Sequence, residues 1–542
     1  MAFSSAGTTH RSTVTGTRGM VASAHPLASL AGARVLMDGG NAFDAAVAVA
    51  AALNVVEPYM SGIAGVGYAL VYSAREDRVL ALDYCGRTPH SATPDAFDSE
   101  SAQDAGSRSC LVPGACGGWL ALLERYGRTD RETAFAPAID LAENGFAVTV
   151  KNAAFIQAAV PRMRPTARRV VLSRGRSPLP GEVLVQQELG RTFRRVVEGG
   201  AEVFYRGDLA RQMGAFVQGE GGLLSERDLA DFEVEWVDAI STPYRGYEVF
   251  CPPPPSAGFQ ILETLNMLEA YPLARMGHHS EEALHLFIEA CKLANADRVE
   301  YAAVGSPPMA GLLSKAYAEK RRALIGERAG VGRGEYYRAT RLSGEVEPGR
   351  EADWINECTT HFDVVDAEGN AVAITQSLGS GFGSGMILGE TGMFLNNFIK
   401  WGDLAPGSPN CIAPHMKIDM CLSPCQVFRE GRLVSALGTP GSWGIQQTTT
   451  QFLTNYLDYG MNIQAAIEAP RFRFEHPGTR VFVEARVPAD VRAGLERRGH
   501  RIDLLPDWSA VVGGAQGITV DAESGALMGG ADPRRDGYAI GM

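Results

Sequence analysis

The sequence of 542 residues contains no run of about 18 apolar residues, so no segment is predicted to cross a membrane as a helix. Residues 1–18 are rich in serine and threonine and lack the apolar stretch of a secretory signal. The nine cysteines are odd in number and show no paired spacing, which fits reduced thiols rather than a disulfide framework. We therefore expect a cytoplasmic protein with no membrane partner.

Signatures of several common enzyme classes are also missing. The sequence has no G-x-S-x-G elbow, no H-E-x-x-H pair and no Walker motif, which argues against the usual serine, zinc and nucleotide enzymes. The glycine-rich stretch 379–385 does not fit the G-x-G-x-x-G spacing of a dinucleotide loop. Cys421 and Cys425 are not backed by a second cysteine pair, so they do not indicate a zinc site. We expect neither a metal nor a cofactor.

The charge balance is acidic, with 50 lysines and arginines against 62 aspartates and glutamates and a net charge of -12. This balance argues against nucleic acid or an anionic membrane as a partner. A hydrophobic content of 45% is typical of a globular protein with a large core. The sequence leaves the oligomeric state open, and a homo-oligomer is compatible with it.

Helix and strand signals extend along the chain without an internal repeat or a long linker. Residues 25–57 are predicted to form two helices, because Pro26 suits a first turn, Gly39-Gly40 a helix end and Asn41 an N-cap. Further helices are expected at 117–126, 132–144, 260–269 and 281–302. Strands are expected at 68–72, 79–84, 362–377, 426–437 and 481–484.

A hairpin that begins near Cys358 is the most informative segment. Thr359 and Thr360 stand at the head of an alternating apolar strand, an acidic-Gly-Asn turn covers 366–370, and a second strand of the same kind follows. Such hairpins are common, and alone this one would indicate little. Its value comes from the motifs on either side of it.

These motifs follow one another in a fixed order over nearly the whole chain. They are 19–23 (GMVAS), 39–46 (GGNAFDAA), 56–58 (VEP), 61–63 (SGI), 112–114 (VPG), 255–258 (PSAG), 289–292 (EACK), 296–298 (ADR), 359–362 (TTHF), 389–390 (GE), 395–397 (LNN), 423–424 (SP), 438–442 (GTPGS) and 469–472 (APRF). The series resembles the γ-glutamyltranspeptidase family, whose members are N-terminal-nucleophile (Ntn) hydrolases.

The resemblance implies an α+β fold, the four-layer αββα sandwich of Ntn hydrolases, in which two stacked sheets lie between helix layers. It also implies a precursor that cuts itself between Cys358 and Thr359. Residues 1–358 would form a large subunit and residues 359–542 a small subunit, and the two would remain intertwined in one structural domain.

The chemistry of such a cut explains why a threonine is suited to this position. A threonine hydroxyl is a weak nucleophile that needs a nearby base, and cleavage would give Thr359 a free α-amine. An α-amine has an ordinary pKa of about 7.7–8.0, so a useful fraction is unprotonated near neutral pH. Nucleophile and base then sit on one residue, which removes much of the orientation cost. The resemblance implies that Thr359, rather than Thr360, is the nucleophile.

Acyl transfer also needs hydrogen-bond donors directed at the developing oxyanion. By resemblance, the N–H groups of Gly441 and Ser442 serve this purpose, in a turn whose glycine allows close approach of the backbone. The family usually has a second glycine where Ser442 stands, but a serine N–H donates equally well. Ser377 matches a hydroxyl residue that supports the nucleophile.

The residues expected to bind substrate depart from the glutamyl enzymes of the family. Relative to those enzymes, Cys85 replaces an arginine, Trp401 an amine-binding acidic residue and Phe398 a polar neighbour. Met420-Cys421 replaces a serine pair, and Gly379 replaces an asparagine. Each buried polar group of a substrate left without a partner costs roughly 1–3 kcal/mol, so γ-glutamyl selectivity should be lost. Arg87 is the candidate for reading a single remaining charge.

We therefore expect a self-processing amidohydrolase or acylase that acts on a small, non-glutamyl amide substrate. Two alternatives stay open. One is a γ-glutamyltransferase or glutathione hydrolase, and the other is an unprocessed relative that serves as a binding protein. Hydrolysis and acyl transfer to another amine are both compatible with the sequence.

Overall fold

Two large sheets form the centre of the computed structural model, which describes residues 9–172, 174–330, 357–475 and 478–542. The first sheet has the order β19-β2-β10-β11-β3-β4-β7, and the second has the order β1-β18-β17-β13-β12-β9-β8. All neighbouring strands in both sheets are antiparallel. The strands of the first sheet are β2 (Gly19–Ser23), β3 (Val66–Ser73), β4 (Arg78–Asp83), β7 (Glu235–Asp238), β10 (Glu357–Asp366), β11 (Ala371–Ser380) and β19 (Tyr538–Gly541). Those of the second are β1 (Val14–Gly16), β8 (Ile240–Tyr244), β9 (Tyr247–Cys251), β12 (Cys425–Arg429), β13 (Arg432–Gly438), β17 (Gln516–Val520) and β18 (Leu527–Ala531).

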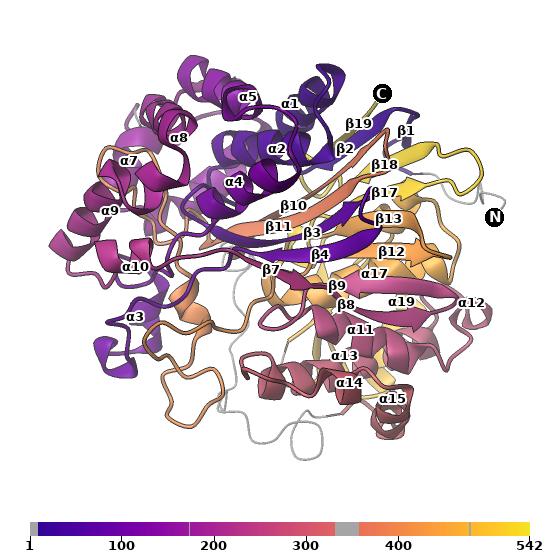
Figure 1. Cartoon of the computed structure of the whole chain (residues 1–542). Coiled ribbons are helices and arrows are strands. Elements are labelled where there is room, and N and C mark those ends of the chain that lie inside the picture. The colour runs from indigo at the N-terminus through magenta and orange to yellow at the C-terminus, as the bar shows by residue number, and fades with distance from the viewer. Residues whose placement is uncertain (1–8, 173, 331–356, 476–477) are drawn as a thin grey trace.

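The two sheets pack face to face, as Figure 1 shows. Apolar side chains of both sheets fill the space between them, with Leu70 and Ala373 from the first sheet against Ala436 from the second. The amide of Gln426 crosses this space and donates to the main-chain oxygens of Leu70 and Ala371, at 3.2 and 3.3 Å.

One group of helices covers the outer face of the first sheet (Figure 1). The central one is α2 (Ala42–Val56), which is buried along its whole length and begins with a capping box between Asn41 and Asp44. It is surrounded by α1 (Pro26–Met37), α4 (Ala115–Tyr126), α5 (Arg131–Asn144) and α8 (Gln187–Tyr205). Beyond them lie α3 (Glu100–Asp104), α6 (Val150–Ala159), α7 (Pro165–Val171), α9 (Asp208–Gly219), α10 (Glu226–Ala230) and the short strands β5 (Phe146–Ala147) and β6 (Val183–Leu184).

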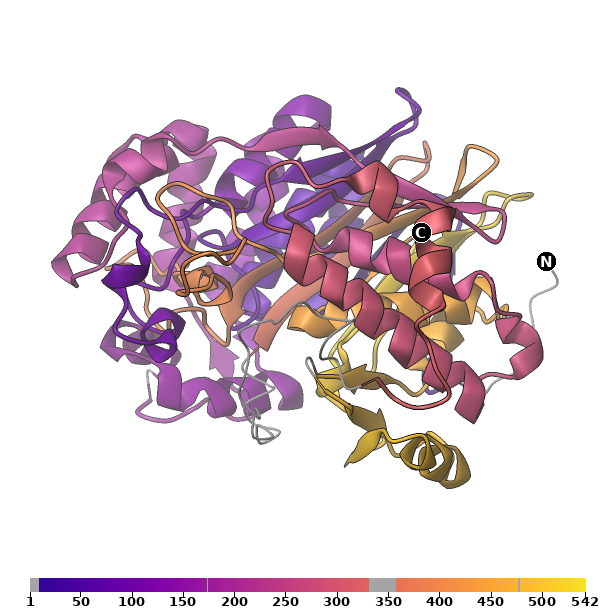
Figure 2. The ribbon, with the colours of Figure 1, turned by 90° about the horizontal axis from the view of Figure 1, so that it is seen from below.

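A second group of helices covers the other sheet, and Figure 2 shows it from below. It is formed by α11 (Gly258–Leu268), α12 (Leu273–Met276), α13 (Glu281–Tyr301), α14 (Met309–Leu312), α15 (Lys315–Arg322), α17 (Ile445–Leu457) and α18 (Ile463–Glu468). A small sheet of β14 (Phe472–Phe474), β15 (Arg480–Glu484) and β16 (Arg501–Leu505), with α19 (Ala489–Arg497), packs against α13.

Most of the predicted elements are present. The helices expected at 25–57, 117–126, 132–144, 260–269 and 281–302 are α1 and α2, α4, α5, α11 and α13. The segment 426–437, where strands were expected, is a hairpin of β12 and β13, and Glu430 and Gly431 adopt positive φ in the turn between them. Helices α8 and α17 were not predicted. No helix among the described residues is long and apolar enough to span a membrane.

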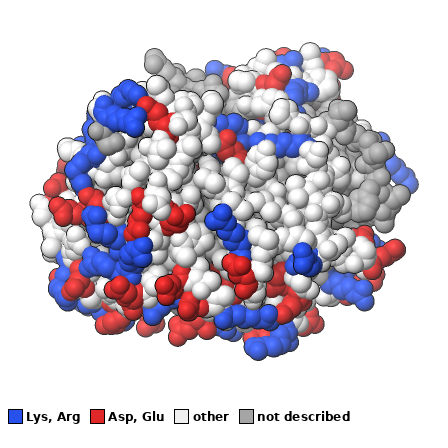
Figure 3. Space-filling view, turned by 90° about the horizontal axis from the view of Figure 1, so that it is seen from above, with Lys and Arg blue, Asp and Glu red and all other residues white. Residues whose placement is uncertain are grey.

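On the face shown in Figure 3, basic and acidic side chains are mixed on the left and along the lower part, and uncharged residues cover much of the centre. At the surface of the molecule, Arg194 pairs with Glu143 and Arg176 pairs with Glu182. Exposed pairs of this kind contribute little to stability.

Candidate active site

Thr359 lies at an irregularity in the hairpin of β10 and β11. Its Cα partner is Ser377, whereas Cys358 pairs with Gly379, so one residue of β11 is left over between them. Such a bulge redirects a side chain relative to the regular strand. Thr359 is only 3% exposed, because β10 is an interior strand between β2 and β11.

Ser377 connects the groups that self-cleavage would use. The Thr359 hydroxyl donates to Ser377 Oγ at 3.1 Å, and Ser377 Oγ donates in turn to the carbonyl oxygen of Cys358. Ser377 Oγ also accepts from the N–H of Gly379 at 2.8 Å, which fixes its direction. The nucleophile and the carbonyl oxygen of the predicted scissile bond thus share one buried hydroxyl.

Two charged residues that sequence reasoning missed lie next to the threonines. Arg535, 3% exposed, donates to the Thr359 carbonyl oxygen at 2.9 Å. Glu57 accepts from the Thr360 hydroxyl at 3.0 Å. Burial raises the pKa of Glu57 to about 7, although Arg535 and the Thr360 hydrogen bond act in the opposite direction. In the sequence, only the match of the VEP motif at 56–58 to the family indicated that Glu57 belongs to the site.

His361 is held rigidly between the two sheets. Its ring nitrogens contact the Thr375 hydroxyl at 2.9 Å and an Asp363 carboxylate oxygen at 3.1 Å, and its side chain is fully buried. A Cβ on Gly438 would lie 2.5 Å from this ring, so only glycine fits at that position. His361 therefore fixes β13 against β10 and so positions the turn that follows Gly438.

The turn after β13 contains the predicted oxyanion donors. Gly441 and Ser442 have φ values of 141° and 50°, and the short helix that Ser442 begins packs against β10. A positive φ is uncommon for serine and marks a constrained backbone. Within the described part of the chain, neither N–H donates a hydrogen bond. Both donors are thus available to a ligand.

The apolar residues predicted to replace the glutamyl clamp come together. Cys85, Phe398, Met420 and Cys421 belong to one buried cluster, and the partly exposed Trp401 packs against it. The rings of Phe398 and Trp401 stack, with centroids 4.6 Å apart. They form an apolar wall on one side of the cluster.

Gly379 stands next to this wall. A Cβ at its position would lie 2.2 Å from Asn397 Oδ1 and 3.1 Å from the Trp401 ring, and its φ is 103°. A larger residue does not fit there without displacing Asn397. A side chain at position 379 would therefore begin in contact with the Trp401 ring.

Arg87 is not part of this cluster. Its guanidinium pairs with Glu235 at 3.1 Å, and Lys417 contacts both Glu235 and Asp83, at 2.8 and 2.7 Å. Arg87 is therefore one member of a charged network that crosses from β4 to β7. It already has a carboxylate partner, which weakens its candidacy as the substrate clamp.

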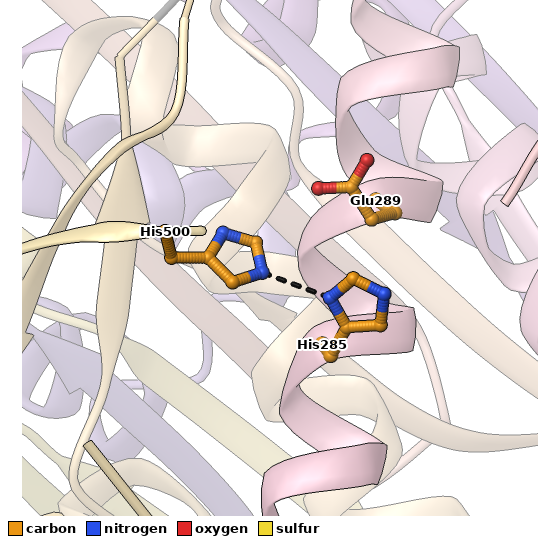
Figure 4. Close-up of side chains that lie close together, drawn as sticks. All are labelled: His285, Glu289 and His500. Atoms are coloured by element: carbon orange, nitrogen blue, oxygen red, sulfur yellow. Dashed lines mark hydrogen bonds between the residues drawn. The ribbon is translucent and has the colours of Figure 1, made fainter. Parts of the chain in front are cut away.

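A second group of chemically capable side chains lies elsewhere, on α13 and before β16 (Figure 4). His285 Nδ1 and His500 Nε2 are 2.9 Å apart, and His285 Nε2 is 2.8 Å from the Gly326 carbonyl oxygen. Glu289 is close to both rings, but its oxygens accept from Lys292 at 2.8 Å and from the Gly330 N–H at 3.0 Å. These bonds join α13 to His500 and to the segment that contains Gly326 and Gly330.

Comparisons with known proteins agree with this geometry. The gamma-glutamyltranspeptidase family model matches residues 28–542. The chain is 36% identical to the acylase ACY 1 proenzyme of Pseudomonas sp. (strain V22), over 99% of this chain and 95% of that protein. It is also 36% identical to the glutathione hydrolase-like YwrD proenzyme of Bacillus subtilis, over 98% and 99%. The crystal structure of cephalosporin acylase from Bacillus halodurans superposes with a TM-score of 0.90 at 34% identity, covering 99% and 98% of the two chains.

The chain therefore belongs to the γ-glutamyltranspeptidase family. It is an enzyme of the Ntn hydrolase type, and the predicted family assignment is confirmed. Relatives described as acylases and as glutathione hydrolases match almost equally well, so similarity alone does not define the substrate.

Proposed function

We propose that this protein is a self-processing amidohydrolase or acylase that cleaves a small, non-glutamyl amide through an acyl-enzyme on Thr359. The observation that carries the proposal is the bonding of Ser377, which contacts both the Thr359 hydroxyl and the Cys358 carbonyl oxygen. Relatives named as proenzymes support a cut that gives subunits 1–358 and 359–542. The two antiparallel sheets between helix groups support the four-layer αββα arrangement.

Self-cleavage would begin with attack of Thr359 Oγ on the Cys358 carbonyl carbon. The hydrogen bond from Ser377 stabilises the negative charge that develops on the carbonyl oxygen. The C–N bond then breaks, its nitrogen takes the proton of the hydroxyl, and Cys358 is held as an ester on Thr359. Water hydrolyses this ester, which leaves a carboxylate on Cys358 and a free α-amine on Thr359.

The same hydroxyl would then attack a substrate amide. The α-amine of Thr359 accepts the hydroxyl proton and later passes it to the leaving amine. The N–H groups of Gly441 and Ser442 are the candidates for binding the oxyanion, because both have free donors in a turn packed against β10. Water releases the acyl group and regenerates the enzyme.

The non-glutamyl part of the proposal rests on the apolar cluster. Its side chains carry no carboxylate that could bind a substrate ammonium group and no guanidinium that could bind a substrate carboxylate. They are Phe398, Trp401, Met420 and Cys421. A γ-glutamyl group buried against these four side chains would find among them no partner for either of its charges. A flat or aliphatic acyl group gains from burial against the Phe398 and Trp401 rings.

The test compares γ-glutamyl p-nitroanilide with a series of simple acyl p-nitroanilides, using purified protein at neutral pH. We expect kcat/KM to be higher for at least one acyl anilide than for the γ-glutamyl compound. The reverse order would support the γ-glutamyltransferase or glutathione hydrolase alternative, which relatives of that name keep open. A chain that stays uncut and hydrolyses neither would support the binding-protein alternative.

A further inference from the structure

The turn with the candidate oxyanion donors contacts the apolar cluster through groups that the proposed mechanism does not use. Trp443, which directly follows Ser442, packs against the cluster that contains Met420 and Cys421. Three residues further on, the Gln446 amide donates to the Cys421 carbonyl oxygen at 2.7 Å. The donors and the segment proposed to contact the acyl group are therefore neighbours.

Arg298 contacts both of these segments from a third element, helix α13. Its guanidinium carbon lies 3.8 Å from the centre of the Trp443 ring, and the guanidinium pairs with the Asp419 carboxylate. Its Nε also donates to Asn295 Oδ1 at 3.2 Å, one turn earlier on the helix. The Arg298 and Asp419 side chains are only 9% and 7% exposed, so little water competes for these contacts. Arg298 ends the ADR motif at 296–298, to which the sequence alone gave no role.

Arginine is suited to holding two segments at once. Its flat guanidinium can stack on an aromatic ring with one face and bond a carboxylate with its edge, and both contacts strengthen away from water. Asp419 directly precedes Met420, so the ion pair fixes the main chain at the cluster. The stacked Trp443 ring fixes the main chain next to Ser442, whose φ of 50° needs support from its surroundings.

We propose that Arg298 is a positioning residue that holds the Ser442 N–H in a fixed relation to the Met420-Cys421 segment. This inference rests on the proposed amidohydrolase function and deepens it. Arg298 acts through Trp443 on the donor and through Asp419 on the cluster, and does not itself contact the substrate. An acyl group that lies against the cluster then has its carbonyl oxygen in line with the donors. Because such donors act on charge that develops in the transition state, loss of Arg298 should lower kcat rather than raise KM.

The test measures kcat and KM separately with the best acyl p-nitroanilide. The variants are Arg298→Met, which removes both contacts, and Arg298→Lys, which keeps the charge but not the flat group. Arg321→Met is the matched control. Arg321 is also a largely buried arginine, pairs with Asp297 of α13 at 3.0 Å and lies over the Tyr317 ring, but it joins α13 to α15.

We expect Arg298→Met to lower kcat about 10- to 100-fold, with KM changed by less than about threefold. Arg298→Lys should fall between this variant and the natural protein, and Arg321→Met should keep the natural kcat. An unchanged kcat in Arg298→Met, a rise in KM alone, or an equal loss of kcat in Arg321→Met would overturn the inference.

A double-mutant cycle decides the matter even where Arg298→Met does not fold. Trp443→Leu keeps an apolar side chain against the cluster but removes the ring on which Arg298 stacks. Because Arg298→Lys also removes this stacking, adding it to Trp443→Leu should lower kcat little further. Effects of the two substitutions that multiply in full would contradict action through the ring.

Amide hydrogen exchange, read by mass spectrometry, separates this inference from the proposed function. If the natural protein cleaves no anilide, the hydrolase proposal fails, and exchange still shows whether Arg298 holds the two segments. We expect exchange to be about tenfold faster in both 418–422 and 441–446 in Arg298→Met, and unchanged there in Arg321→Met. Natural exchange rates in either segment of Arg298→Met would contradict the inference.

Discussion

Replacing Glu57 with glutamine should change how stability depends on pH. Burial raises the pKa of Glu57 to about 7 from its ordinary value of 4.5, so the folded chain keeps a proton that the unfolded chain releases. The stability from this group is fully present below pH 4.5 and is lost as the pH rises through about 7. At 1.36 kcal/mol per pKa unit, the difference between these two pKa values lowers the free energy of unfolding by about 3 kcal/mol at pH 8.

Glu57→Gln removes this ionisation, because an amide stays neutral and its oxygen can still accept from the Thr360 hydroxyl. The assay is denaturant unfolding at pH 4.5, 6 and 8, in a Thr359→Ala background so that both chains stay uncut. We expect the free energy of unfolding of the variant, relative to that of its parent, to rise by up to about 3 kcal/mol between pH 4.5 and pH 8. A second variant, Glu198→Gln at an exposed site on α8, should show no such trend. A pH-independent difference for Glu57→Gln, or a gain at the acidic end, would refute the reasoning.

Changes at three further positions test the site. Thr359→Ala should leave a single uncut chain, whereas Thr359→Ser should still process; electrophoresis of freshly purified protein checks both. Ser377→Ala removes the hydroxyl that contacts Thr359 and Cys358, so processing should slow by about 10- to 100-fold, measured as the half-time of cleavage. Gly379→Ala should lower stability by about 1–3 kcal/mol more than Gly246→Ala, because both positions have positive φ but only the first lacks space for a Cβ; equal changes in Tm would count against the crowding argument.

Local patterns predicted the parts of the fold that depend on neighbouring residues. The Asn41 cap and the glycines before it marked the boundary of α1 and α2, and alternation marked the hairpin of β10 and β11. Helix α17 was missed because its threonines have low helix propensity, and burial of almost every residue maintains it instead. Helix α8 was not predicted because its sequence contains a glycine pair at 199–200, and Gly200 departs from helical geometry.

The site was predicted only as far as the motifs extend. Thr359 and Ser377 are neighbours on one hairpin, so strand register brings them together. Arg535 contacts the carbonyl of Thr359 from 176 residues away, which no local pattern encodes. Long-range charge contacts of this kind need the folded arrangement.

The central claim is that Thr359 is freed by self-cleavage and becomes the nucleophile. The most direct measurement is the intact mass of freshly purified protein, together with the N-terminal sequence of each fragment. The account predicts two chains, the second beginning Thr359-Thr360-His361-Phe362. A single stable chain of 542 residues, or a cut at another bond, would contradict it.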